Sequence, residues 1–448
     1  MSKVLAPDVN VTSNKRVAWP RVCVAGEFRN LHWIVLLAFA LRATIRWHLA
    51  ADDFWTNGYG FFFNLARSIA AGNGFAVNGH PTAFRVPLYP AFLAVLTFGQ
   101  KAFVPILLAQ SLIGAATVLC AALIAREMFG NAAALMAAFL TAIYPYYVIH
   151  DTALQETSLY TFLTALAVFL LMRVRRSGSL LTAACAGIVL GLAVLARANL
   201  ALFALAAPLW LIVPEASAKA PWRHQVLSCM LCAGTLALIL SPWLVRSYAL
   251  TGSPSLSTQS GFFLWLGNNP YTFSRYPVQS IDLSERVALA ALSPSDRAQI
   301  AALGSNEAAV DRWFLERGLD YMLANPVRAF VSGLRKIAAG FCVLPSPRKS
   351  FWPSLFYLFS YGPIMLLGTW GMWHFRRRWR VHLIFYLLFA SFAGITAVFF
   401  GHTSYRVYLD VYWIVFAAGL LEQFVPSHVD AIRMMATDSL RTKHRGLV

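Results

Sequence analysis

The feature that most constrains this chain is a series of long apolar runs that contain almost no charge. They include residues 31–39, 103–125, 132–149, 159–172 and 227–240. Several of them, with their flanks, reach the ~20 residues that an α-helix needs to cross ~30 Å of hydrocarbon. Only 12% of the residues are charged, against roughly 25% in an average soluble domain. The sequence therefore predicts an all-α fold, a polytopic transmembrane helical bundle of about 10–12 spans.

Polar segments divide the predicted bundle into parts. We expect a cytoplasmic tail (1–30), a transmembrane catalytic module (31–245) with a first external loop (51–85), a long external loop (246–350), further transmembrane helices (351–424) and a basic cytoplasmic tail (425–448). Two apolar pieces, 86–100 and 331–345, are shorter than a usual span. They are expected to be re-entrant, interfacial or tightly paired with other helices.

The chain has a net charge of +18, and its basic residues are distributed as is typical of membrane proteins. Lysines and arginines cluster in short loops between apolar runs, at 173–176 and 376–380, and in the two tails. Such clusters mark cytoplasmic loops. The pattern indicates a cytoplasmic N-terminus and a first apolar segment that is retained as a span. It argues against nucleic acid as a partner.

The first external loop carries its own helical pattern. Phe61, Phe62, Leu65 and Ile69 recur at helical spacing, and Asn64, Arg67 and Ser68 lie between them. This pattern predicts an amphipathic helix on the membrane surface. Residues 71–74 (Ala-Gly-Asn-Gly) should end it as a turn.

The long stretch 246–350 holds seven acids, from Asp282 to Asp320, and these acids are expected to form a solvated surface. The six cysteines show no framework, because Cys229 and Cys232 lie inside an apolar run without a nearby His or acid.

Four groups of ionisable residues reach the same external face under this topology. The first is Asp52 and Asp53 with His80 and Arg85. The others are the corner 144–156, which contains His150, Asp151 and Glu156; the segment 197–199, which begins with Arg197; and the loop 401–406, which contains His402 and Arg406. Ionisable groups at membrane depth are costly, so their recurrence on one face predicts a site.

Carboxylates beside arginines at a membrane surface suit one reaction class. A carboxylate removes a proton from an acceptor hydroxyl, while arginines hold a lipid phosphate leaving group in their planar fork. We assign the base to Asp53 or Asp52, with Glu156 assisting. The candidate substrate- or phosphate-binding residues are His80, Arg85, Asp151, Arg197, Arg246, His402 and Arg406.

Each of these residues also has a structural alternative. The two aspartates would be ordinary polar residues at a helix exit, Glu156 would pair with a neighbouring cation, and Arg197 would extend to the interface. The paired acids would also suit a divalent cation, although nothing in the sequence requires a cofactor.

Several segments together resemble a known group of enzymes. They are Asn64-Leu65-Ala66-Arg67 to Phe75, Pro81-Thr82-Ala83-Phe84-Arg85-Val86-Pro87-Leu88-Tyr89-Pro90, Tyr144-Pro145 with Leu154-Gln155-Glu156, Gly191-Leu192-Ala193 with Leu195-Ala196-Arg197, and Ser241-Pro242-Trp243-Leu244-Val245-Arg246 with Gly267-Asn268-Asn269-Pro270. In this order the chain resembles bacterial glycosyltransferases of the GT-C superfamily, polytopic enzymes related to dolichyl-phosphate-mannose–protein mannosyltransferases and to the lipid A aminoarabinose transferase.

The resemblance implies a polyprenyl-phosphate sugar donor, an active site at the outer face and inversion at the anomeric carbon. It also implies a bacterial plasma membrane location and an acceptor that is a glycan, lipid or protein. The family's loop carboxylate would correspond to Asp52 or Asp53. In many relatives that acid lies closer to the Leu-Ala pair, where this chain has Asn57-Gly58. Either the helix end is shifted here, or Asp151 or Glu156 supplies the base.

Two other functions compete with the enzyme. A transporter or flippase of a lipid-linked sugar would place polar residues along a path between the two faces, whereas the interiors of the predicted spans are nearly free of charge. A glycosyltransferase-like subunit without activity is the second, because the aspartates are displaced.

Overall fold

The computed structural model describes residues 30–49, 54–55, 60–214 and 221–424, and these residues are almost entirely helical. Asp52 and Asp53 lie outside them. One part of the chain is a bundle: α1 (Leu31–His48), α5 (Phe103–Met128), α6 (Asn131–Ile143), α7 (Pro145–Asp151), α8 (Thr157–Ser177), α9 (Leu180–Ala196), η2 (Ala198–Leu200), α10 (Ala201–Ala206), η3 (Pro208–Ile212), α11 (Trp222–Thr251), α17 (Phe351–His374), η4 (Arg376–Arg378), α18 (Trp379–Val398), η5 (Thr403–Leu409) and α19 (Asp410–Glu422).

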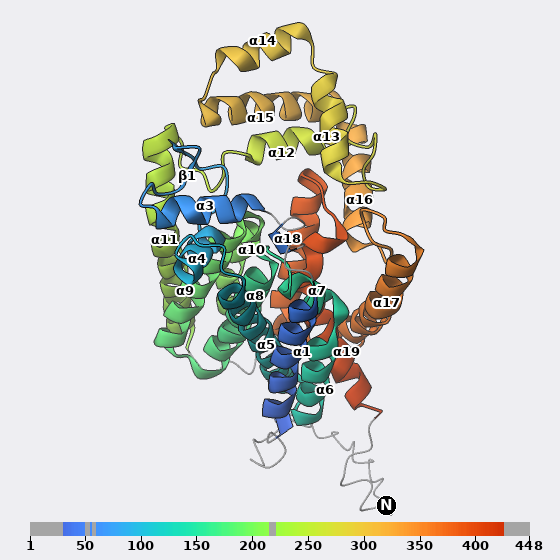
Figure 1. Ribbon diagram of the computed structural model, residues 1–448. Coiled ribbons are helices and arrows are strands. Elements are labelled where there is room, and N and C mark those ends of the chain that lie inside the picture. Colours follow the sequence, from blue (N-terminus) through green and yellow to red (C-terminus); the bar gives the residue numbers. More distant parts are fainter. Residues whose placement is uncertain (1–29, 50–53, 56–59, 215–220, 425–448) are drawn as a thin grey trace, which may run out of the picture.

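The remaining elements gather at one end of the bundle, shown at the top of Figure 1. They are α3 (Gly60–Ala70), the hairpin β1 (Ala76–Val77) and β2 (His80–Pro81), α4 (Leu88–Thr97), α12 (Ser260–Gly267), α13 (Ile281–Ala290), α14 (Pro294–Ala302), α15 (Glu307–Ala324) and α16 (Pro326–Phe341). The strands pair antiparallel, with Val77 opposite His80. Helix α3 and the turn after it confirm the amphipathic helix predicted for the first loop.

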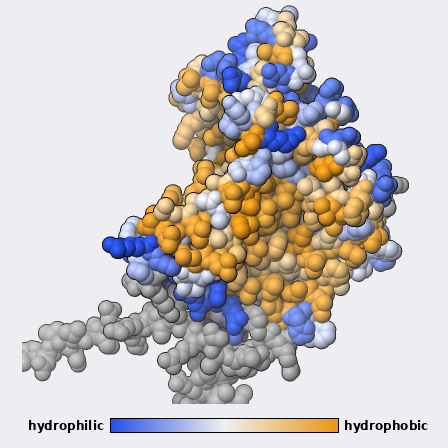
Figure 2. All heavy atoms as spheres, turned by 90° about the vertical axis from the view of Figure 1, so that its left-hand side faces the viewer, coloured by the Kyte–Doolittle hydropathy of each residue, from blue (hydrophilic) through white to orange (hydrophobic). Residues whose placement is uncertain are grey.

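The bundle has the surface of a membrane protein. Figure 2 shows a broad apolar area across the face in view, with hydrophilic residues concentrated above and below it. On α11, Met230, Leu238 and Val245 are all strongly exposed, as expected for side chains that face lipid rather than water. The predicted helical membrane bundle is confirmed.

The number of spans is a separate matter. Within the described ranges, four helices are long and apolar enough to cross a membrane: Phe103–Met128, Thr157–Ser177, Trp222–Thr251 and Arg376–Val398. Helices α6 and α7 make a fifth if they form one span, bent by 54° at Tyr144. Shorter apolar helices accompany them, so the count of about 10–12 stays a prediction.

Prolines interrupt two apolar stretches of the bundle. Pro145 begins α7, which interrupts the run 132–149, and Pro208 separates α10 from η3 within 199–213. Proline has no N–H to donate and is accepted at the first position of a helix. The run 132–149 is therefore divided between α6 and α7, and residues 198–212 form η2, α10 and η3.

The stretch 246–350, which was predicted to be a long external loop, is largely helical. Helix α11 continues to Thr251, and α12 to α16 pack around Trp265, Tyr276 and Phe314. Side-chain caps start three of these helices, because the oxygens of Ser280, Ser293 and Asn306 accept backbone N–H groups of the first turn. A cap satisfies donors that a helix start otherwise leaves unpaired.

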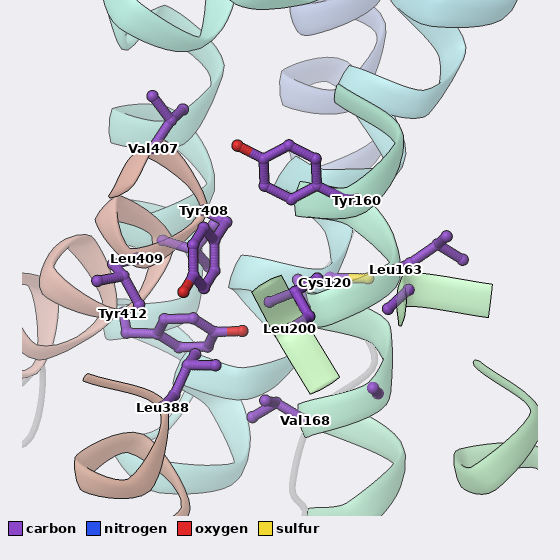
Figure 3. Close-up of a cluster of buried hydrophobic side chains, with 14 of the residues drawn as sticks. Cys120, Tyr160, Leu163, Val168, Leu200, Leu388, Val407, Tyr408, Leu409 and Tyr412 are labelled. Carbon is purple, nitrogen blue, oxygen red and sulfur yellow. The ribbon is translucent and has the colours of Figure 1, made fainter. Parts of the chain in front are cut away.

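The bundle core is centred on α19, which is buried from Asp410 to Leu420. Figure 3 shows Tyr408 of η5 and Tyr412 of α19 facing Tyr160 and Leu163 of α8 across an apolar cluster. Helix α17 lies very close to α19, because a Cβ at Gly368 would lie 2.6 Å from the Trp413 carbonyl oxygen. Small residues allow such close backbone approach between membrane helices.

Two ion pairs are buried in the bundle, so the interiors of the spans are not as free of charge as expected. Arg42 of α1 contacts Asp151 of α7 at 2.6 Å. Arg406 contacts Asp410 at 2.5 Å, and Tyr144 donates to the other oxygen of Asp410 at 2.9 Å. A buried charge is tolerated when it is paired and hydrogen-bonded.

Candidate functional site

The corner between α7 and α8 places Glu156 at the N-cap of α8. Its Oε1 accepts a hydrogen bond from Arg197 at 3.1 Å. Its Oε2 is buried and has no hydrogen-bond partner within the described ranges. A carboxylate with one oxygen held and one open is suited to accept a proton or a hydroxyl hydrogen bond from a ligand.

Arg197 lies where α9 ends, because its backbone turns to an extended conformation (φ −154°, ψ 111°). Its guanidinium is 4.8 Å from the ring centroid of Tyr160 and 4.9 Å from that of Tyr405. Tyr160 comes from α8 and Tyr405 from η5. Stacking between two rings fixes the plane of the guanidinium, so α8, α9 and η5 together orient the Glu156–Arg197 pair.

Arg85 is also stacked between two aromatic rings, and a series of contacting rings connects it with Arg197. Its guanidinium is 5.5 Å from the Phe61 centroid and 5.1 Å from that of Phe263. Phe263 contacts Phe400, which in turn contacts Tyr405. Stacking uses the faces of a guanidinium, and a phosphate binds at its edge. Arg85 of the first loop and Arg197 of α9 are thus linked through Phe263, Phe400 and Tyr405, the aromatic wall.

Arg246 holds the first loop instead of an open site. It donates to the carbonyl oxygens of Thr82 at 2.9 Å and Phe75 at 2.8 Å, and it stacks on Trp243. With two of its nitrogens on backbone carbonyls, its predicted role on phosphate is not favoured. It supports the loop that carries Arg85.

Glu307, which was expected on a solvated surface, fastens that loop to α15. Its Oε1 accepts from Thr82 Oγ1 at 2.5 Å, and its Oε2 accepts from the Ala83 N–H at 3.1 Å and from Thr258 Oγ1 at 2.9 Å. Asp311 likewise accepts from the Phe262 N–H at 2.9 Å. These two acids connect helices α12 and α15 to the site, which corrects the expectation for them.

The Glu307→Gln variant should loosen this connection, because an amide keeps the size but has only one oxygen to accept with. We expect the first loop to be cut several-fold faster by a protease added to the intact protein. Glu316→Gln is the matched control, since Glu316 is exposed on the same helix. Equal cleavage rates in the two variants would show that Glu307 does not hold the loop.

Four other predicted site residues are not brought into this group. Asp151 and Arg406 are buried in the ion pairs described above, so neither presents an open charge. His80 is exposed on the hairpin. His402 is buried between Ser346 and the start of α13, and its Nε2 accepts the Ile281 N–H at 3.3 Å. Burial lowers the pKa of His402 to about 4, so it is neutral at pH 7 and cannot hold phosphate by charge.

Leu49 and Phe54 are the nearest described residues before and after the two aspartates, and both contact Arg46. Arg46 was not among the predicted site residues. Arg46 donates to the Leu49 carbonyl oxygen at 3.1 Å and stacks 5.5 Å from the Phe54 centroid. The roles of Asp52 and Asp53 stay predictions. Among the residues the structure describes, no three acids, histidines or cysteines gather as metal ligands; a divalent cation at the aspartate pair also stays a prediction.

The sequence and the fold were compared with those of known proteins. Residues 80–245 match the family described as dolichyl-phosphate-mannose-protein mannosyltransferase. A crystal structure of the Archaeoglobus fulgidus oligosaccharyltransferase, tethered with an acceptor peptide, superposes with a TM-score of 0.53 and 17% identity, over 88% of this chain and 49% of that one. The chain has the GT-C fold.

Other solved structures with the GT-C fold are less similar. The Archaeoglobus fulgidus AglB in complex with an inhibitory peptide and a dolichol-phosphate has a TM-score of 0.49 at 16% identity, over 88% of this chain and 50% of that one. ArnT from Cupriavidus metallidurans bound to undecaprenyl phosphate has a TM-score of 0.41 at 14% identity, over 89% and 78%. The chain spans about half the length of the oligosaccharyltransferases. No protein of curated function matches it by sequence.

Proposed function

We propose that this protein transfers a sugar from a polyprenyl phosphate to an extracytoplasmic acceptor, with inversion at the anomeric carbon. The observation that carries the proposal is the Glu156–Arg197 pair, whose second carboxylate oxygen has no hydrogen-bond partner among the described residues. The pair lies at one end of the aromatic wall that leads to Arg85. The match to the mannosyltransferase family spans all three of these residues, and it supports a lipid phosphate as the donor class.

Each group has a role in a single displacement. A carboxylate takes the proton of the acceptor hydroxyl, the acceptor oxygen bonds to the anomeric carbon, and the bond from that carbon to the phosphate oxygen breaks. The polyprenyl phosphate leaves with the added negative charge, which an arginine stabilises. Asp53 or Asp52 is the proposed base, and Glu156 assists or replaces it. Asp151 is the weaker candidate because Arg42 holds it.

Arg85 is the proposed phosphate holder. It lies on the loop that follows the aspartates, and stacking on Phe61 and Phe263 orients its guanidinium. The site end of the bundle is proposed to face away from the cytoplasm of a bacterial cell, because the basic clusters 173–176 and 376–380 lie at the other ends of α8 and α17.

The chief rival is a transporter or flippase for the same lipid. The buried pairs Arg42–Asp151 and Arg406–Asp410 provide charge inside the bundle, but in each pair the arginine is bound to its own carboxylate. An inactive subunit is the second rival. Purified protein in liposomes, supplied with undecaprenyl-phosphate mannose or glucose and an extract of envelope glycans and lipids, tests all three. The proposal expects free undecaprenyl phosphate and a glycosylated product. Donor movement across the bilayer without release, or neither result, would contradict it.

The Arg85→Gln variant should weaken binding of undecaprenyl phosphate by about tenfold or more, because hydrogen bonds to charged groups contribute roughly 1.5–3 kcal/mol. Titration calorimetry in detergent measures this change. Arg317→Gln, which removes an exposed cation of α15, should leave the affinity within twofold. An unchanged affinity in Arg85→Gln would remove Arg85 from the phosphate site.

A further inference from the structure

His150, at the end of α7, has a ring nitrogen that the mechanism above does not use. Its side chain is only 8% exposed. Its Nδ1 lies 2.5 Å from Gln155 Nε2, and the same amide nitrogen donates to the His150 carbonyl oxygen at 3.3 Å. Because a carbonyl can only accept, this contact fixes the amide nitrogen as the donor. Nδ1 therefore accepts, and the proton of the neutral ring is on Nε2.

That Nε2–H has no hydrogen-bond partner within the described ranges, although it is buried. The Oε2 of Glu156 is in the same condition. Two residues link these groups. Gln155, which bonds His150, precedes Glu156 in the chain, and Arg197, which is paired with Glu156, acts electrostatically on His150. One unused donor and one unused acceptor therefore lie in one polar cluster.

A site with one donor and one acceptor suits the sugar of a lipid-linked sugar better than its phosphate. A phosphate offers only acceptors, and the open oxygen of Glu156 would repel it. Adjacent hydroxyls of a sugar can accept from His150 and donate to Glu156 at the same time. Resting on the proposed function, we propose that His150 and Glu156 bind hydroxyl groups of the donor sugar, while the phosphate lies at Arg85.

The two atoms are covered in this structure, so a ligand reaches them by moving side chains above them. Tyr405, half-buried and stacked on Arg197, is at the edge of the cluster. Burying polar atoms without partners is unfavourable. A sugar that satisfies both atoms removes that penalty, and this favours the sugar-bearing lipid over the bare phosphate.

The test compares two probes, undecaprenyl-phosphate mannose and bare undecaprenyl phosphate, on purified full-length protein. We expect His150→Phe to weaken binding of the mannose-bearing lipid about 5- to 10-fold and to leave the bare lipid within twofold. His150→Gln, whose amide can donate from a similar place, should recover part of the loss. The matched control is His374→Phe, at an exposed histidine of α17.

Three results would overturn the proposal. They are equal losses for both lipids in His150→Phe, an unchanged affinity for both, or a lower melting temperature with unchanged affinities, which would indicate that the polar atoms bind only water. The same measurements include lipids that carry glucose or galactose. The differences in affinity among the three sugar-bearing lipids should be smaller in His150→Phe than in the unchanged protein. These experiments measure binding and do not depend on catalysis. If the protein binds the lipids as expected but transfers no sugar, the proposed function is contradicted and the binding proposal is not.

Discussion

The Asp53→Asn variant is expected to lose at least 100-fold in the rate of sugar transfer, because a positioned general base typically contributes 10²–10⁴-fold. An amide keeps the shape of the side chain but does not take a proton at neutral pH. Asp52→Asn is measured beside it, and a full loss in Asp52→Asn alone would assign the base to Asp52 instead. The assay is release of undecaprenyl phosphate from undecaprenyl-phosphate sugar by purified protein.

The Glu156→Gln variant belongs to the same experiment as the alternative base. If either aspartate variant is inactive and Glu156→Gln retains activity with weaker donor binding, Glu156 assists. If both aspartate variants are fully active and Glu156→Gln is not, the base is Glu156. Full activity in all three would end the catalytic assignment. Asp296→Asn, on α14 away from the site, serves as the control.

Breaking the Arg406–Asp410 pair should give the largest loss of stability. Both side chains are fully buried, and removal of one partner from a buried pair typically costs about 3–5 kcal/mol because the other charge is left without compensation. We expect Asp410→Asn and Arg406→Met each to lower the melting temperature in detergent strongly. The double variant Arg406→Met/Asp410→Leu should recover much of the loss, since it leaves no charge behind.

The exposed pair Arg317–Asp296 provides the comparison, at 3.0 Å. Exposed pairs typically contribute about 0–1 kcal/mol, so Asp296→Asn should change the melting temperature little. A double variant as unstable as the single ones would contradict the account. Activity should also fall in the Asp410 variant, because η5 carries both Arg406 and the Tyr405 ring that orients Arg197.

The elements that local patterns determine could be predicted from the sequence. The spacing of Phe61, Leu65 and Ile69 predicted α3, and the apolar runs predicted the membrane bundle. The breaks at Pro145 and Pro208 had a visible signal, since proline starts a helix more readily than it continues one. Capping residues such as Ser293, followed by Pro294, also marked helices in the stretch that was expected to be a loop.

The pairing of distant residues could not be predicted in this way. Glu156 and Arg197 were both candidates, but they lie 41 positions apart, and no local pattern says that one holds the other. Arg42 was overlooked because it lies within an apolar run, so nothing in the sequence indicated that Asp151, a candidate for substrate or phosphate binding, pairs with it. The sequence did not distinguish Glu307 from the other acids of 246–350, because its contacts arise only when α15 packs against the first loop. These outcomes depend on tertiary packing.

The most direct test asks whether the first loop and η5 open to the same side of the membrane. Single cysteines replace Asp53 and, separately, Ser404 in a background without other cysteines, and cells are treated from outside with a thiol reagent that does not cross lipid. We predict labelling of both positions, and protection of both when undecaprenyl-phosphate mannose is bound. Labelling of one from outside and of the other only from the cytoplasm would mean that no common pocket exists, and the proposed transferase site would be wrong.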